Sequence, residues 1–444
     1  MQTQGVITVI AEIAPERVPS LVSLLGDLSR ALTAPPGQSA PIVDFRTMES
    51  VHFARFAVLP EDSKGRRHLA FSSAYDGPRG VHLSELVSKA QPGLVAIFEH
   101  CVGFPERARI AKNTLLGFIE EKSIRHGALH VGYVGRSVQD VQREDALRKF
   151  IEEKLDANPP DGRSALRVRD QIREWVKKSE FAWALEPRQE EISPLGVDGF
   201  WSALGWIATL VGVVVGGGIL AAAFGPVALA LYGAGLGLVG GAILALLRYH
   251  ELTEPAKTDS DISHGFEHQE EEDVGIRNQL THLVDVKPGP FRYFLLKTVL
   301  HAVELRARFE FYTGDLGGIE TIHCAHWCVL EGENDAKPRL LFFSNYDGSW
   351  ERYLGDFIEE AGGGMTSVWS NTVNYPRARF LLWDGATNER VFKAWTRESQ
   401  VHTDVWYRAN PDVSIRNIND NSRLRDGLSG PMSEDEAKRW LMLL

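Results

Sequence analysis

The chain has 444 residues, a formal net charge of −11 and three cysteines. This length suffices for two or three domains, and the acidic balance argues against a nucleic-acid partner, because no basic stripe could neutralise phosphates. The cysteines are too few for a disulfide framework, and we expect neither a disulfide nor a metal site from them. The first residues lack a basic stretch followed by an apolar one, so we expect no signal peptide.

Residues 1–155 are expected to form a first α+β domain. Apolar residues follow strand periodicity over 7–13, 51–59, 68–73 and 128–134, and helical periodicity over 18–31 and 83–100. An additional helix is predicted over 110–124. The order β-α-β-β-α-β is that of a ferredoxin-like unit, in which helices pack on one face of an antiparallel sheet.

Residues 156–198 are expected to form a charged helical stalk that leads toward a membrane. The following segment, 199–249, contains 48 consecutive residues, from Phe200 to Leu247, without Asp, Glu, Lys or Arg. As one helix this run would reach roughly 70 Å, whereas the hydrocarbon core of a bilayer is about 30 Å thick. Gly225-Pro226 lies at its midpoint and is typical of a helix break. We therefore predict a transmembrane helical hairpin with both ends on one side; the alternative is a hairpin buried in a soluble domain.

Glycines recur at four-residue spacing along the predicted hairpin, at Gly212 and Gly216 and then at Gly233, Gly237 and Gly241. This spacing lets helices approach closely in lipid, either within one hairpin or between hairpins of different chains. Basic residues flank the hairpin on both sides, which favours a cytoplasmic location for both soluble parts. We expect a homo-oligomer in a lipid bilayer, and a pore built from several hairpins is one alternative.

The sequence after the hairpin repeats the sequence before it. Residues 250–274 are acidic and polar, which predicts a linker, and residues 275–430 form the second copy. Residues 51–105 align with 322–376 at a constant offset of 271, and weaker similarity pairs Thr8 with Thr281 and Tyr133 with Tyr407. A helix over 288–309 combines aromatic and basic residues, so it belongs either to the membrane interface or to the core of the second copy. A C-terminal helix is expected over 431–444, and the two copies are expected to pair their sheets.

A Tyr-Asp-Gly sequence in each copy supplies the first candidate site residues: Tyr75 and Asp76, then Tyr346 and Asp347. A short acid between a strand and a helix usually accepts the free N–H groups of that helix's first turn. The alternative interpretation is a distal acid that faces a ligand held against the sheet.

Histidines supply the candidate cofactor ligands. His52 and His323 occupy equal positions in a predicted strand, where they are either hydrogen-bonded core residues or ligands. His326 lies on the opposite face of that strand from His323, so the two cannot easily share one metal ion. His301 lies on the helix predicted over 288–309 and could be an axial haem ligand if that helix faced a cavity.

The second copy carries the motifs NQLTHLVDVKPG, LLFFSNYDGSWERYLGDFI and VWYRANPDVSIRNIND. With these motifs the chain resembles a family of uncharacterised bacterial membrane-associated proteins with duplicated ferredoxin-like domains. At the level of the fold, it is also similar to dye-decolourising peroxidases and chlorite dismutases. Those peroxidases have a Gly-x-x-Asp-Gly distal motif, and here Ser73 and Ser344 stand at its first position. This second resemblance implies haem as a cofactor and Asp76 or Asp347 as a distal acid.

These observations lead to one expected function and one alternative from another class. We expect a membrane-anchored protein of a bacterial inner membrane whose tandem ferredoxin-like domains act in the cytoplasm as a non-enzymatic binding or self-assembly module. No Walker A, GxGxxG, HExxH, GxSxG or CxxC sequence is placed where its chemistry would need it. The alternative is a haem peroxidase-like oxidoreductase.

Overall fold

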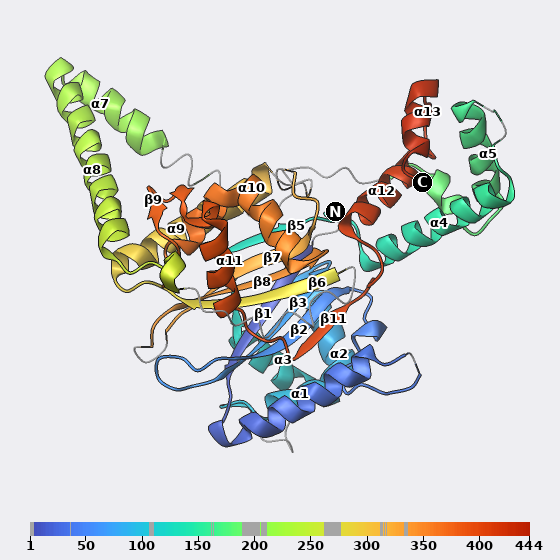
Figure 1. Cartoon of the computed structure of the whole chain (residues 1–444), viewed down its shortest axis with the longest axis horizontal. Coiled ribbons are helices and arrows are strands. Elements are labelled where there is room, and N and C mark those ends of the chain that lie inside the picture. Colours follow the sequence, from blue (N-terminus) through green and yellow to red (C-terminus); the bar gives the residue numbers. More distant parts are fainter. Residues whose placement is uncertain are drawn as a thin grey trace.

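The first sheet has five antiparallel strands in the order β11-β2-β3-β1-β4. They are β1 (Gln4–Glu12), β2 (Val51–Leu59), β3 (His68–Asp76), β4 (Ser123–Ile124) and β11 (Val405–Arg408). Three helices cover its outer face: α1 (Val18–Thr33), α2 (Arg79–Phe98) and α3 (Lys112–Glu121) (Figure 1). The computed structural model describes residues 4–35, 37–105, 111–160, 162, 164–188, 205, 211–261, 277–310, 314, 316, 318–332 and 336–444.

The second sheet has four antiparallel strands in the order β5-β7-β8-β6. They are β5 (Ala128–Val131), β6 (Arg277–Asp285), β7 (Ile322–Leu330) and β8 (Arg339–Asp347). Its outer face is covered by α9 (Pro290–Phe309), α10 (Trp350–Trp369) and α11 (Glu389–Glu398) (Figure 1). Leu296 and Leu300 of α9 are buried in the core of this half, so the structure favours the core interpretation of this helix over the membrane interface.

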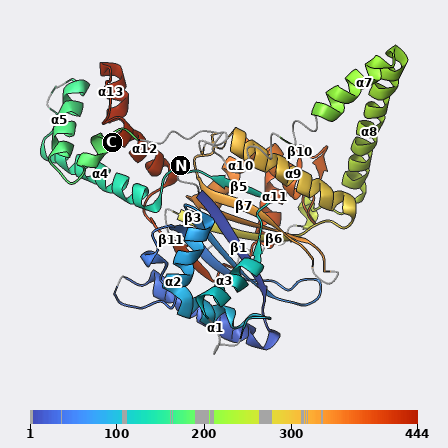
Figure 2. The same cartoon turned by 180° about the vertical axis from the view of Figure 1, so that it is seen from behind.

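The inner faces of the two sheets pack against each other, and the whole body is therefore a four-layer α+β structure (Figures 1 and 2). Ala57 and Leu59 of the first sheet share one apolar cluster with Leu341 and Phe343 of the second. Burial of these side chains removes apolar surface from water and holds the halves together.

The two sheets have the same strand register. Val51 pairs with Tyr75 and Ile322 pairs with Tyr346, and an irregularity follows in both copies, at His52 and at His323. One prediction about this arrangement is wrong. The strand predicted over 128–134 does not close the first unit, because β5 pairs with β7 of the second sheet, while β11 pairs with β2 of the first. The short β4 occupies the free edge of β1 instead.

A helical lobe extends from one side of the body (Figure 2). It consists of α4 (Val138–Ala157), α5 (Ala165–Lys177), α12 (Ile415–Asp426) and α13 (Glu434–Leu441). Ile172 of α5 and Trp440 of α13 belong to its apolar core. Helix α5 thus packs on the C-terminal helix and does not form the expected stalk; residues 189–198 of that prediction lie outside the described residues.

On the other side of the body the chain projects as a helical hairpin (Figure 1). A π-helical segment (Gly212–Gly216) continues into α7 (Gly217–Ala223), and α8 (Pro226–Thr253) returns. The helix breaks at Gly225, which has φ +103° and is followed by Pro226 as the first residue of α8, as the Gly-Pro pair predicts. Residues 200–204 and 206–210 of the predicted first helix lie outside the described residues.

Helix α8 is longer than expected at its C-terminal end. It ends at Thr253, so the first four residues of the predicted linker, 250–253, are helical. The Glu254 carboxylate pairs with Arg292 and Lys287, which attaches the end of the helix to α9 and the second sheet. Residues 262–274 of the predicted linker lie outside the described residues.

Candidate functional site

In the structure, each candidate histidine lies beside a candidate aspartate, although the two are 24 residues apart in the sequence. His52 Nε2 lies 2.8 Å from Asp76 Oδ1, and His323 Nε2 lies 2.6 Å from Asp347 Oδ1. In each pair the histidine is on the second strand of its half and the aspartate ends the third strand. All four residues are buried between the two sheets and the helical lobe.

Each aspartate also binds the beginning of a lobe helix. Asp76 Oδ2 accepts the N–H of Val138, at 2.8 Å, and Asp347 Oδ2 accepts the N–H of Ile415, at 2.6 Å. These are the first residues of α4 and α12, whose N–H groups have no partner within their own helix. The negative charge is also favourable at a helix N-terminus.

This geometry corrects the capping interpretation. Neither aspartate caps the helix that follows it, because α2 begins after Pro78 without a side-chain cap and Ser349 caps α10. The glycine after each aspartate makes a tight turn, with φ +80° at Gly77 and +79° at Gly348. Each His–Asp pair therefore fixes one lobe helix to its sheet.

Aromatic rings and one arginine surround the pairs. The ring of Tyr133 lies 4.3 Å from that of His52, and the ring of Phe53 lies 5.6 Å from that of His323. Burial, and then the charge of Arg277, lowers the pKa of His323 to about 4, so this imidazole is neutral at pH 7. A neutral His323 that donates Nε2–H to Asp347 has a positioning role.

The sequence pairing of Tyr133 with Tyr407 is wrong. The N–H of Gly132 binds the carbonyl of His323, and the N–H of Ala409 binds the carbonyl of His52. Tyr133 therefore corresponds to Asn410. In this stretch the sequence alignment of the two copies is displaced by three residues from the structural equivalence, which the strand pairing defines.

The candidate tyrosines do not lie with the aspartates. Tyr75 stacks on His82 of α2, with ring centroids 4.1 Å apart, and Tyr346 stacks on Tyr353 of α10, at 3.9 Å. Neighbouring residues of a strand point to opposite faces, so each tyrosine enters the outer helical layer while its aspartate faces the other sheet. Tyrosine and aspartate cannot act on one ligand here.

One of the three candidate haem ligands lies apart from the other two. His301 lies on an exposed part of α9, whereas His52 and His323 are buried in the centre of the molecule. The described residues contain no cluster of three or more His, Cys, Asp or Glu that could hold a metal ion.

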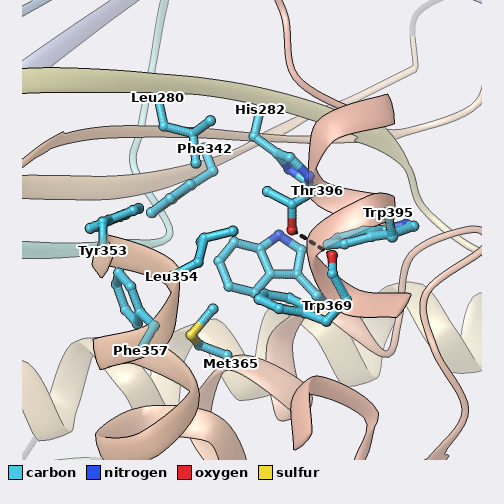
Figure 3. Close-up of a pocket in the computed structure, with 11 residues that line it drawn as sticks. Leu280, His282, Phe342, Tyr353, Leu354, Phe357, Met365, Trp369, Trp395 and Thr396 are labelled. Carbon is cyan, nitrogen blue, oxygen red and sulfur yellow. Dashed lines mark hydrogen bonds between the residues drawn. The ribbon is translucent and has the colours of Figure 1, made fainter. Parts of the chain in front are cut away.

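A small cavity lies in the second half, between the sheet and α10 and α11 (Figure 3). The cavity volume is about 10 Å³, enough for about one water molecule. Such a volume excludes haem from this position. Figure 3 shows that His282 of β6 points from the sheet toward Trp369, Trp395 and Thr396.

His282 is the unusual member of this cavity. It is 1% exposed, and in the described part of the chain neither of its ring nitrogens has a hydrogen-bond partner. Burial lowers its pKa to about 3, so the ring is neutral at pH 7. The Trp369 indole N–H in the same cavity also lacks a partner among the described residues. These groups could hold one water molecule, since buried water binds otherwise unsatisfied polar groups.

Sequence analysis did not identify His282, although a comparison of the two aligned strands would have shown a histidine in place of a valine. Val9 and His282 occupy the same register position, opposite Phe71 and Phe342. A histidine at the register position that a core valine holds in the other sheet marks a place where the two halves differ in chemistry.

The hairpin glycines have open surroundings within the chain. At Gly212, Gly216, Gly233, Gly237 and Gly241 an added Cβ would meet no atom within 4 Å. The described helices touch elsewhere, where Tyr232 lies against Gly217 and its hydroxyl donates to the carbonyl of Val213. Within the described part of the hairpin, the five glycines therefore do not pack against the facing helix, which was one of the two expectations for them.

No protein-family model matches this chain, and no curated protein matches its sequence.

Proposed function

We propose that this protein is anchored in a bacterial inner membrane by the hairpin and acts at the cytoplasmic face as a binding and self-assembly module. Helix α8 carries the proposal, because its apolar window is long enough to cross a membrane and none of it is buried inside the chain. Residues 226–247 form 22 helical residues without a charge, which rise about 33 Å, close to the thickness of a hydrocarbon core of about 30 Å.

The distribution of exposed apolar side chains supports a membrane as the partner. Outside the hairpin, large hydrophobic side chains of the described residues are exposed at five scattered positions of the body: Val22, Ile42, Val81, Val102 and Met442. Four more, Phe294, Phe380, Leu382 and Trp383, lie on segments that contact the C-terminal end of α8. Along residues 211–246 such side chains are exposed throughout. A continuous apolar surface of this kind is typical of an interaction with a membrane or a protein.

The body is best explained as two ferredoxin-like repeats that exchange their last strands. The support is the order β4-β1-β3-β2 in one half, the order β6-β8-β7 in the other, and the equal irregularities at His52 and His323. The His–Asp pairs hold helices in place, which fits a binding scaffold better than a catalytic centre.

One experiment tests the anchor. Leu238 lies near the middle of α8 and is 75% exposed, and Val81 on α2 is 63% exposed. Arginine at a bilayer centre costs about 2.5–3.5 kcal/mol, so Leu238→Arg should weaken retention in carbonate-washed membranes. Val81→Arg is the matched control and should remain in the membrane like the wild type. Protease added to sealed cells should spare both soluble parts; recovery of the wild-type chain in the soluble fraction would contradict the proposal.

Self-association is the second part of the proposal. The open surroundings of the glycine row at Gly233, Gly237 and Gly241 leave room for a helix of another chain. Gly237→Leu should shift detergent-solubilised protein toward a monomer. Gly235→Leu makes the same change on the opposite face of α8, about 200° around the helix, and should leave the mass unchanged. A wild-type monomer in mild detergent would contradict self-association but not the anchor.

A further inference from the structure

A short β-hairpin beside the base of α8 has an unusual tip. Strands β9 (Ala378–Arg379) and β10 (Trp383–Asp384) are joined by Phe380, Leu381 and Leu382. The side chains of Phe380, Leu382 and Trp383 are exposed by 39%, 51% and 53%. Three large apolar side chains thus reach the surface within four consecutive residues.

The backbone of this tip is strained. Phe380 has φ +48° and Leu381 has φ +66°, and the N–H of Leu382 binds the carbonyl of Arg379 across them. A turn with positive φ at both central positions normally contains Asn and Gly, since bulky residues are strained there. Strain of this kind persists where the surrounding structure imposes it, and it is concentrated at functional positions.

Helix α8 imposes this conformation. One Glu251 oxygen accepts the N–H of Phe380 and the other accepts the N–H of Leu381, both at 2.9 Å. Arg248 pairs with Glu251 at 3.0 Å, and its guanidinium lies 5.7 Å from the centre of the Phe380 ring. The tip is therefore attached to the final turns of α8 through its own backbone.

This attachment fixes the height of the tip relative to the apolar span. Arg248 is the first charged residue after the uncharged run, so it marks the end of the span. Glu251 lies three residues further, which is about 4.5 Å along the helix axis. In Figures 1 and 2 the β9–β10 hairpin stands beside the lower part of α8, on the side of the body from which the helices project.

We propose that the tip formed by Phe380, Leu382 and Trp383 inserts into the headgroup layer of the same bilayer that the helical hairpin crosses. This inference rests on the proposed membrane anchor. Tryptophan and phenylalanine beside arginines are typical of that layer, where apolar rings and charged groups are both accommodated. Arg377 lies just before β9 and Arg379 lies in it, paired with Asp384 at 3.4 Å; both are exposed and can meet anionic headgroups. Exposure of these apolar side chains is unfavourable in water, and its removal contributes to binding at this position.

Depth-dependent quenching tests the proposal on the full chain. Single cysteines replace Leu382 in the tip, Val239 in α8 and Val81 on α2, and each carries a fluorophore in vesicles of phosphatidylcholine and phosphatidylglycerol. Cys101, Cys324 and Cys328 are buried, and burial raises the pKa of each thiol to about 12, so they should stay unlabelled. Nitroxide lipids carry the quencher either at the headgroup or deep in the acyl chain.

The expected result is loss of fluorescence from Leu382→Cys with the headgroup quencher, from Val239→Cys with the deep quencher, and from Val81→Cys with neither. Quenching at Val239→Cys without quenching at Leu382→Cys would overturn the inference and leave the anchor intact. Unquenched fluorescence at Val239→Cys would overturn the anchor itself, and the inference with it.

Discussion

In each half of the body, one residue at the same position of the second strand reaches across the interface into the other sheet, but the two side chains differ. Arg55 of β2 reaches into the second sheet, where it donates to the carbonyls of Leu280 and Ser344 and to the hydroxyl of Thr281. The equivalent His326 of β7 reaches into the first sheet, where its Nε2 lies 3.1 Å from the hydroxyl of Thr8. The backbone is thus nearly symmetric, whereas the polar contacts are not.

The two cores between each sheet and its outer helices also differ in polarity. In the first half, Val9 lies among the phenylalanines of β3, α2 and α3 and is fully buried. In the second half, His282 takes the place of Val9, and Trp369 and Trp395 take the places of Phe98 and Phe118. Around Val9 the first core is apolar, whereas the equivalent part of the second core contains polar nitrogens beside a cavity. The same strand register thus accommodates either an apolar or a polar side chain at this position. The fold of the second half therefore does not require His282.

The largest expected effect comes from removing the arginine that crosses the interface. Arg55→Met would remove one donor from each of several buried acceptors of the second sheet, including Asn345 Oδ1, which would keep only the indole N–H of Trp406. We expect a loss of about 3–5 kcal/mol in the free energy of unfolding. His326→Leu removes the contacts of one neutral nitrogen with the hydroxyls of Thr8 and Ser72 and should cost about 1 kcal/mol. Chemical denaturation measures both, and equal losses would show that the asymmetry has no energetic consequence.

The His–Asp pairs should give the next largest effect. Asp347→Ala and Asp76→Ala each leave a helix N–H and a histidine without an acceptor, which should cost about 2–3 kcal/mol. The loss should be larger at Asp347, because the buried guanidinium of Arg277 lies near it, whereas neutral Gln4 donates to Asp76. The Asn variants keep one acceptor oxygen and serve as controls. A larger loss at Asp76 would contradict this account.

The smallest effect concerns His282. At pH 7, His282→Leu should raise stability by roughly 1 kcal/mol, because it removes a buried imidazole without a partner. The folded protein holds this group at a pKa of about 3, compared with 6.5 in the unfolded chain. Below pH 6.5 the unfolded chain therefore binds a proton that the folded chain does not, and stability falls as the pH decreases toward 3.

The pH dependence of the free energy of unfolding provides a second test of His282. The His282 contribution to the slope should approach about 1.4 kcal/mol per pH unit below pH 6, and His282→Leu should remove it from unfolding curves recorded between pH 7 and 4. Val9→Leu, at the equivalent position of the first half, should leave the slope unchanged. A loss of stability in His282→Leu at pH 7 would indicate that a bound water or ligand satisfies the imidazole.

Much of the local structure could be predicted from the sequence. The strand pair joined by a polar loop, the outer helices, the tight turns at Gly77 and Gly348 and the helix break at Gly225 all follow from periodicity and glycine chemistry. The candidate site could be predicted only in part. His52, Asp76, His323 and Asp347 were identified, but their pairing and their contact with the lobe helices were not, because those contacts join segments far apart in the chain.

The sequence by itself determined the mixed α+β character, the repeated register and the position of the uncharged run, since these depend on side-chain pattern over short distances. Only the tertiary structure decided which sheet receives β5 and β11. Both strands are four residues long, and the edges of β2 and β7 offer them nearly the same hydrogen-bonding groups, so local pattern cannot choose between the two sheets. The same reason applies to Glu251, because a carboxylate on a helix carries no local sign that it will hold the backbone of Phe380 and Leu381, 129 and 130 residues away.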